Sequence, residues 1–101
     1  MTGMDCIAAL KALGELSRMR IIRLLLKERL GVNEISERLA MSQYNVSKHL
    51  RILKEAGLVN VVRRGQQRLY GIVPRLRSRL AANRTVLELG CCAFRFDKLP
   101  R

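Results

Sequence analysis

Apolar residues recur at intervals of three and four along the first half of the chain, the spacing that predicts amphipathic helices. In residues 3–14 this spacing holds for Ile7, Leu10 and Leu13, and Gly14 follows them. Glycine commonly ends a helix because it adopts the left-handed backbone conformation without strain. We therefore predict a short first helix over residues 3–14.

A second helix is predicted to begin at Ser17, whose side chain can accept a hydrogen bond from the backbone at the helix start. Its charged residues lie mostly on the side away from its apolar residues, which is typical of a helix with one face in the core. Gly31 is predicted to end this helix. The apolar positions are Met19, Ile22, Leu25 and Leu26.

A third helix of two turns is predicted to start at Asn33, another residue suited to capping a helix. Ile35 and Leu39 then face the core, and the acidic and basic residues between them stay exposed. Met41 follows in a tight turn.

The clearest helical pattern in the chain begins at the capping residue Ser42 and ends at Gly57. Together with the preceding short helix and the tight turn, it forms the helix-turn-helix pattern over residues 33–57. The apolar positions of this second helix of the pair are Val46, Leu50 and Leu53.

Beyond the fourth helix the pattern changes to runs rich in β-branched and aromatic residues, over residues 58–73. Gly65 and Gln66 separate two such runs, with arginines on both sides, which indicates a β-hairpin.

A last helix is predicted over residues 74–90, because proline fits the first turn of a helix and glycine its end. A short cysteine-containing tail, residues 91–101, follows it. The whole chain, residues 1–101, is then a single domain, mainly α-helical with a small β-hairpin.

The charge of the chain is strongly positive, with 20 Lys and Arg against 8 Asp and Glu, a formal net charge of +12 and a pI near 11.1. Nine basic residues and one acidic residue fall within residues 42–79, so this stretch carries +8 of the +12. A polyanion is the expected partner, and it is expected to bind there.

No apolar run approaches the roughly 20 residues that cross a bilayer, and the start of the chain lacks the pattern of a signal peptide. We therefore expect a soluble, cytoplasmic protein with no membrane partner. In a reducing compartment its three cysteines are expected to be thiols rather than structural disulfides. A single histidine and eight scattered acids offer no catalytic set, so an enzyme is not expected.

Three segments resemble the winged helix-turn-helix repressors of the ArsR/SmtB family: LKALGELSRMRIIRLLL, VNEISERLAMSQYNVSKHLRILKEAGLV and VRRGQQRLYGIV. They span roughly residues 10–73. The resemblance implies a homodimeric bacterial transcriptional repressor that leaves a double-stranded DNA operator when an inducer binds, usually a metal or metalloid ion and sometimes a redox signal. It also implies that the helices at residues 3–14 and 74–90 form the dimer interface, and that residues 58–73 are the wing.

The resemblance places the DNA-reading helix at residues 42–56, and the side chains there suit that role. Gln43 and Asn45 are the preferred readers of base edges, with Tyr44 and Lys48 beside them, and the wing tip is predicted to reach phosphates or the minor groove. The alternative for the wing arginines is a charged strand edge that prevents aggregation. The predicted DNA-binding residues are Ser42, Gln43, Tyr44, Asn45, Ser47, Lys48, His49, Arg51, Arg63, Arg64, Gln66, Gln67 and Arg68.

Two sensor sites known in the family are absent from this sequence. The site before the DNA-reading helix would need thiols where this chain has Gly31, Asn33 and Ser36, and the site in the last helix would need histidine. The resemblance would bring Cys6 near the end of the last helix, where Cys91 and Cys92 lie, either within one protomer or across the dimer axis.

Three thiolates suit a thiophilic ion such as As(III) or Sb(III), whereas Zn usually takes a fourth ligand. We therefore predict that Cys91, Cys92 and Cys6 bind the inducer, and that no cofactor is needed for folding. Burial of the cysteines in a dimer interface is one alternative. Thiol redox or persulfide sensing, with Cys6 paired to Cys91 or Cys92, is another, and a ligand-independent basic DNA-binding module is a third.

Overall fold

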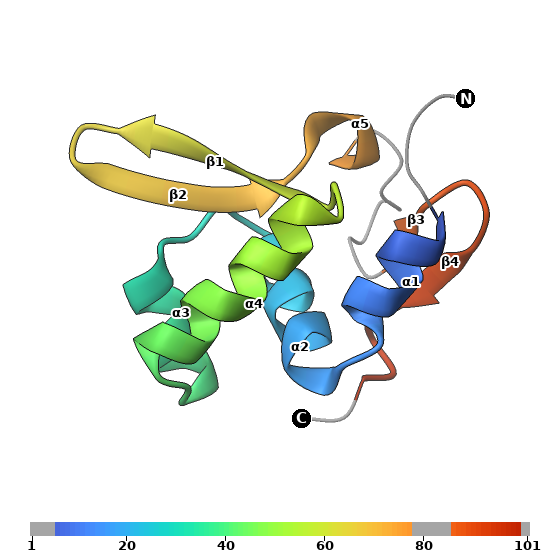
Figure 1. The fold of residues 1–101 in the computed structure, drawn as a ribbon, viewed down its shortest axis with the longest axis horizontal. Helices are drawn as coiled ribbons and strands as arrows, with labels where there is room; N and C mark the ends of the chain where they lie inside the picture. The colour runs from blue at the N-terminus through green and yellow to red at the C-terminus, as the bar shows by residue number, and fades with distance from the viewer. Residues whose placement is uncertain (1–5, 78–85, 100–101) are drawn as a thin grey trace.

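The computed structural model describes residues 6–77 and 86–99 (Figure 1). A group of helices carries a long β-hairpin that extends away from them, and a second, smaller hairpin lies beside α1 near the C-terminus. This arrangement confirms the predicted winged helix-turn-helix fold. The elements in chain order are α1 (Cys6–Leu13), α2 (Leu16–Leu25), α3 (Val32–Leu39), α4 (Gln43–Glu55), β1 (Val59–Arg64), β2 (Gln67–Ile72), α5 (Pro74–Arg77), β3 (Val86–Glu88) and β4 (Ala93–Arg95).

The core lies between the helices and is closed by the start of the long hairpin and by the small one. The apolar positions predicted for α4 are fully buried, as is Ile35 of α3, whereas Leu39, the other position predicted to face the core, is only partly buried. None of the described residues that are buried is polar or charged, so burial of apolar surface stabilises the domain. No helix among the described residues is long and apolar enough to cross a membrane. Core residues from the helices include Ile21, Ile22, Leu25, Ile35, Val46, Leu50 and Leu53.

The second helix is shorter than predicted and begins with a different cap. Glu15 is the N-cap, and its side chain accepts a hydrogen bond from the backbone nitrogen of Arg18 at 3.0 Å, so the predicted cap Ser17 lies inside the helix. The helix ends at Leu25 because the chain becomes extended at Leu30, which exchanges two backbone hydrogen bonds with Tyr70 of β2, at 3.0 and 2.8 Å. The prediction that it runs to Gly31 was therefore wrong, since pairing with the wing competes with the helix.

The helix-turn-helix has the predicted arrangement, with one shifted cap. The N-cap of α3 is Gly31, whose backbone nitrogen donates to Glu34 Oε1 at 3.0 Å, so Asn33 lies within the helix and does not cap it. The turn passes through Ala40 in the left-handed conformation (φ 55°), and Ser42 caps α4 as predicted. This turn fixes the direction of α4 relative to α3.

The wing is an antiparallel hairpin that turns at Gly65 (φ 64°), as the sequence predicts. Arg29, in the segment between α2 and α3, contacts the wing by donating to Asn60 Oδ1 at 2.8 Å and to the carbonyl oxygen of Leu69 at 3.3 Å. A Cβ at Gly71 would lie 2.7 Å from the Arg29 Cγ, so a glycine is needed there for this contact. One side chain thus contacts both strands and ties the wing to the helices.

The predicted last helix is wrong over its final residues. Helix α5 covers Pro74–Arg77, whereas β3 pairs with β4 in an antiparallel hairpin; residues 78–85 of the predicted helix lie outside the described residues. Leu87 and Leu89 are buried and Glu88 between them is exposed, which is the alternation of a strand. Gly90 (φ 93°) therefore lies in a hairpin turn, and part of the predicted tail is a strand.

Candidate nucleic-acid interface and cysteine cluster

The exposed face of α4 combines an aromatic ring with two cations. Its opposite face is held in the core, so the exposed side chains have a fixed direction. Tyr44 is 76% exposed, so its ring is available to a partner. Lys48 and Arg51 lie one and two turns further along the same face. A shallow pocket of about 270 Å³ on this face is lined by Tyr44, Ser47, Lys48 and Arg51.

The first turn of α4 presents the predicted base readers. Gln43 and Asn45 are exposed. Ser42 is exposed too, but its Oγ accepts a hydrogen bond from the Asn45 backbone nitrogen at 3.1 Å, so its first role is to cap the helix. The first turn of a helix that enters the major groove is where base contacts are made. The positions of these side chains therefore fit the predicted reading surface.

His49 differs from the other predicted DNA-binding residues because it faces inward. It is half-buried, and Arg18 Nη1 lies 3.2 Å from its Nδ1, while Arg18 Nε donates to the carbonyl oxygen of Ala12. Since arginine can only donate, Nδ1 is the acceptor and the ring proton is on Nε2. Arg18 thus connects the end of α1 to α4. Nothing in the sequence pattern singled out this arginine.

The pKa of His49 lies below its ordinary value of 6.5, mainly because burial disfavours the charged ring; Arg18 and Lys48 lower it further, and Glu15 opposes them. The unfolded chain therefore binds more protons, and the stability that the neutral ring contributes is complete above pH 6.5 and is lost as the pH falls through the lowered pKa.

We expect the free energy of unfolding to decrease between pH 7 and 5 and His49→Gln to flatten this decrease, as measured by urea denaturation. An unchanged slope in the variant would contradict the assignment.

The tip of the wing is positively charged on both strands. Arg63 and Arg68 are directly opposite each other in the strand register, and both are exposed, as are Arg64, Gln66 and Gln67. Like charges at directly opposite positions destabilise a hairpin. A strand edge that only has to avoid aggregation does not require this destabilising pair of like charges. This pair therefore favours a polyanion as the partner of the wing.

Helix α1 leaves part of its apolar surface uncovered. Ala9, Ala12 and Leu13 pack into the core, whereas Ile7 and Leu10 are 61% and 42% exposed. These two side chains lie one turn apart on the same face. The first helix was predicted to lie in a dimer interface, and this uncovered face is where a second copy would pack.

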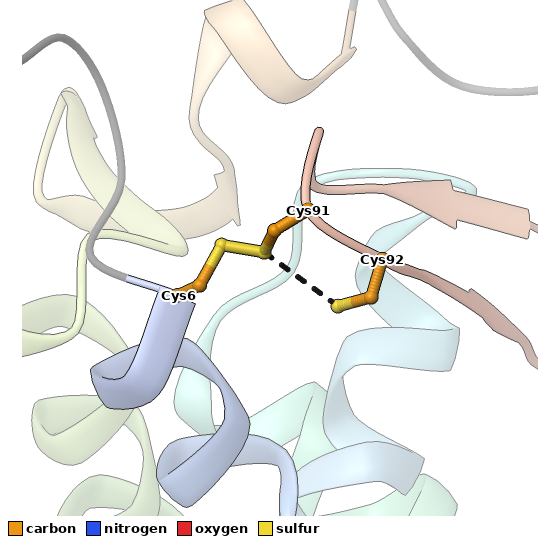
Figure 2. Close-up of a disulfide and its surroundings, with 3 residues drawn as sticks. All are labelled: Cys6, Cys91 and Cys92. Carbon is orange, nitrogen blue, oxygen red and sulfur yellow. Dashed lines mark hydrogen bonds between the residues drawn. A yellow bond between two sulfur atoms is a disulfide. The ribbon is translucent and has the colours of Figure 1, made fainter.

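The three cysteines lie together at the start of α1 and the turn between β3 and β4 (Figure 2). Cys6 and Cys91 form a disulfide within one chain, with their Cα atoms 6.5 Å apart, and the Cys92 Sγ lies 3.8 Å from the Cys91 Sγ. The expectation that all three are thiols was wrong for two of them, because the tertiary fold brings these residues within bonding distance. Among the described residues, no group of three or more His, Cys, Asp or Glu could hold a metal ion.

Comparison with known proteins shows the same fold in bacterial regulators. Residues 17–61 match the family described as "Bacterial regulatory protein, arsR family". The curated "Transcriptional activator HlyU" of Vibrio cholerae serotype O1 is 39% identical over 64 residues, which are 63% of this chain and 59% of the relative's length.

Two solved structures are also similar. "Reduced HlyU" from Vibrio cholerae N16961 has a TM-score of 0.65 and 33% identity, with 73% of this chain and 79% of that one covered. The homodimeric winged helix-turn-helix DNA-binding domain of Mb0332 from Mycobacterium bovis has a TM-score of 0.68 and 30% identity, with 73% and 68% covered.

Proposed function

Because this chain belongs to the arsR family of bacterial regulatory proteins, we propose that it binds a DNA operator as a homodimer in the cytoplasm and that the Cys6–Cys91 disulfide controls this binding. The observation that carries the proposal is the exposed face of α4, which presents Tyr44, Lys48 and Arg51 on a helix held firmly in the core. The positively charged wing tip supports the same partner.

In a dimer, the redox state of the cysteines affects DNA binding through the contact between the protomers. Two DNA-reading helices in a dimer must lie about one helical turn apart, ~34 Å, to enter successive major grooves. The uncovered face of α1, with Ile7 and Leu10, is the proposed contact between protomers. Cys6 lies at the start of this helix, so a disulfide to Cys91 restrains α1 against the C-terminal hairpin.

The redox state can also affect α4 within one protomer, through contacts of Arg18. Arg18 contacts the Ala12 carbonyl oxygen at the end of α1 and His49 on α4. A shift of α1 therefore changes a contact of the DNA-reading helix directly. Disulfides in a reducing compartment are usually transient and report oxidation, which supports a sensor rather than a permanent link. The oxidised and reduced forms must differ in DNA affinity, because equal affinity shifts no equilibrium.

We expect oxidised wild-type protein to bind its operator at least 10-fold more weakly than reduced protein, measured by fluorescence anisotropy with labelled duplex. The Cys6→Ser variant should bind the operator with the affinity of the reduced wild type under both oxidising and reducing conditions, because it cannot form the Cys6–Cys91 disulfide. Cys92→Ser is the matched control, because it removes a thiol and keeps the Cys6–Cys91 pair.

Equal affinity of the two redox forms would contradict redox control. The sign of regulation is read from a promoter–reporter fusion: deletion of the regulator raises expression if the chain is a repressor, as predicted, and lowers it if the chain is an activator, the role named for HlyU.

A thiophilic metalloid is the second candidate for the inducer. With the disulfide formed, the described residues hold no group of three possible metal ligands. Reduction of the Cys6–Cys91 bond would give two further thiols near Cys92, whose Sγ lies 3.8 Å from the Cys91 Sγ, and this proximity supports the candidate. Three sulfur ligands are the set that As(III) or Sb(III) takes. Titration of the reduced, operator-bound protein with arsenite and with zinc tests this candidate, and release by arsenite alone is the expected result.

The wing is expected to contribute through phosphates. Arg64→Ala removes one positive charge from each wing of the dimer, and each phosphate contact contributes ~0.9 to the slope of log affinity against log salt. We expect the slope to fall by ~2 and affinity for all sequences to weaken together. Lys98→Ala is the control, because it removes one exposed charge from a position after β4, outside the wing. Equal slopes for the two variants would rule out a phosphate contact at Arg64.

A further inference from the structure

The third cysteine lies where it can attack the disulfide. The Cys92 Sγ is 3.8 Å from the Cys91 Sγ, and Figure 2 shows the sulfur of Cys91 between those of Cys6 and Cys92. Thiol–disulfide exchange proceeds by attack of a thiolate on one sulfur with departure of the other. The displacement is in line, so the attacking sulfur must approach from the side opposite the leaving one. Cys92 occupies that side of the Cys91 sulfur.

We propose that Cys92 is the internal nucleophile that opens the Cys6–Cys91 disulfide, an inference that rests on the proposed redox control and deepens it. The Cys92 thiolate bonds to the Cys91 sulfur, the Cys6–Cys91 bond breaks, and Cys6 leaves with the electron pair and takes a proton from water. The number of disulfides is unchanged, and no oxidant or reductant is consumed. The product is a Cys91–Cys92 disulfide and a free Cys6, which releases α1 from the hairpin.

The new bond is easier to reduce than the one it replaces. Consecutive Cα atoms are ~3.8 Å apart, whereas ordinary disulfides span ~4.4 to 6.8 Å, so a Cys91–Cys92 bond is strained. It also lies in the exposed turn that contains Gly90. A monothiol of the glutathione class attacks this bond to form a mixed disulfide, and a second monothiol removes the first as its own disulfide. Three protein thiols result.

Direct attack by an external thiol on the original bond is hindered. The in-line path to the Cys91 sulfur is taken by the sulfur of Cys92, and Cys6 is half-buried at the start of α1. An internal nucleophile also has a high effective concentration. Both factors direct the opening of the disulfide through Cys92.

The test compares the rate at which glutathione opens the disulfide in oxidised wild type and in Cys92→Ser, by quenching with a maleimide and locating the label by peptide mapping. Serine keeps the shape of the side chain and cannot exchange. We expect at least 10-fold slower opening in the variant, because it lacks the internal thiol that attacks the Cys91 sulfur. Quenching wild type without glutathione should yield some label on Cys6 with a Cys91–Cys92 bond, independent of protein concentration.

Equal or faster opening in Cys92→Ser would overturn the proposal, because a residue that only shields the bond would speed opening when removed. Label on Cys91 with a Cys6–Cys92 bond would overturn the direction of attack. Intact mass shows beforehand whether Cys92→Ser forms the Cys6–Cys91 disulfide. If it does not, Cys92→Ala replaces it in the test. These readouts need no DNA: equal operator affinity of the redox forms would refute the proposed control while leaving the exchange intact.

Discussion

Replacing both Lys48 and Arg51 with alanine is expected to weaken operator binding on the order of 1,000-fold. The two side chains lie on the exposed face of α4 and are not part of the core. A homodimer loses four charged contacts, and each is worth at least ~1 kcal/mol, so the total exceeds ~4 kcal/mol, or about three powers of ten in affinity. Fluorescence anisotropy at fixed salt, against a labelled operator duplex, measures the loss.

The matched control is the double variant Lys27→Ala with Lys98→Ala, which removes the same charge from exposed positions outside α4 and the wing. It should reduce affinity only a few fold, through the lower overall charge. Thermal unfolding should be unchanged in both double variants, since all four side chains are exposed or outside the core. Similar affinities of the two would show that α4 does not bind DNA through this face.

Phe96→Ala is expected to lower the free energy of unfolding by about 3–5 kcal/mol, the usual cost of truncating a buried phenylalanine. The side chain is 2% exposed and belongs to the core cluster that also contains Leu87 and Leu89. For a domain of 101 residues this loss corresponds to a fall in Tm of more than about 10 °C. Calorimetry on the oxidised protein measures it, since oxidation keeps the hairpin connected to α1 in both proteins.

The control for this prediction is Phe94→Ala, the same substitution two residues earlier on β4, where the ring is only partly buried. It should cost clearly less. Equal small losses for the two variants would show that the C-terminal hairpin is not packed on the core, and would remove the basis for the proposed coupling of the disulfide to α1.

The helix-turn-helix and the wing could be predicted from the sequence because their signals are local. Ser42 caps a helix whose apolar positions repeat at helical spacing, Gly57 and Gly65 adopt the left-handed conformation where the chain must turn, and the wing arginines flank that turn. Each feature depends on a few neighbouring residues. The exposed positions of α4 followed from the same periodicity.

The last helix could not be predicted correctly, because its sequence is compatible with two structures. Residues from Pro74 onward favour a helix locally, and the helical turn at Pro74–Arg77 agrees. Further along, Leu87 is buried on β3, which pairs with β4, and Leu89 is buried directly after that strand. The gain from that burial depends on the rest of the core, which no short window of sequence contains.

The candidate DNA-binding surface depends on local sequence, whereas the cysteine pair and the Arg18–His49 contact depend on the tertiary fold. The positive charge, the helix-turn-helix and the direction of its exposed face follow from the composition and from contacts within a few residues. The Cys6–Cys91 pair is 85 residues apart, and the contact of Arg18 with His49 spans 31. Such contacts form only after the core has brought distant segments together, because their loop-closure entropy must be offset by burial elsewhere. The cysteines of the proposed sensor were therefore identified from the sequence, whereas the pairing of Cys6 with Cys91 depends on the tertiary fold.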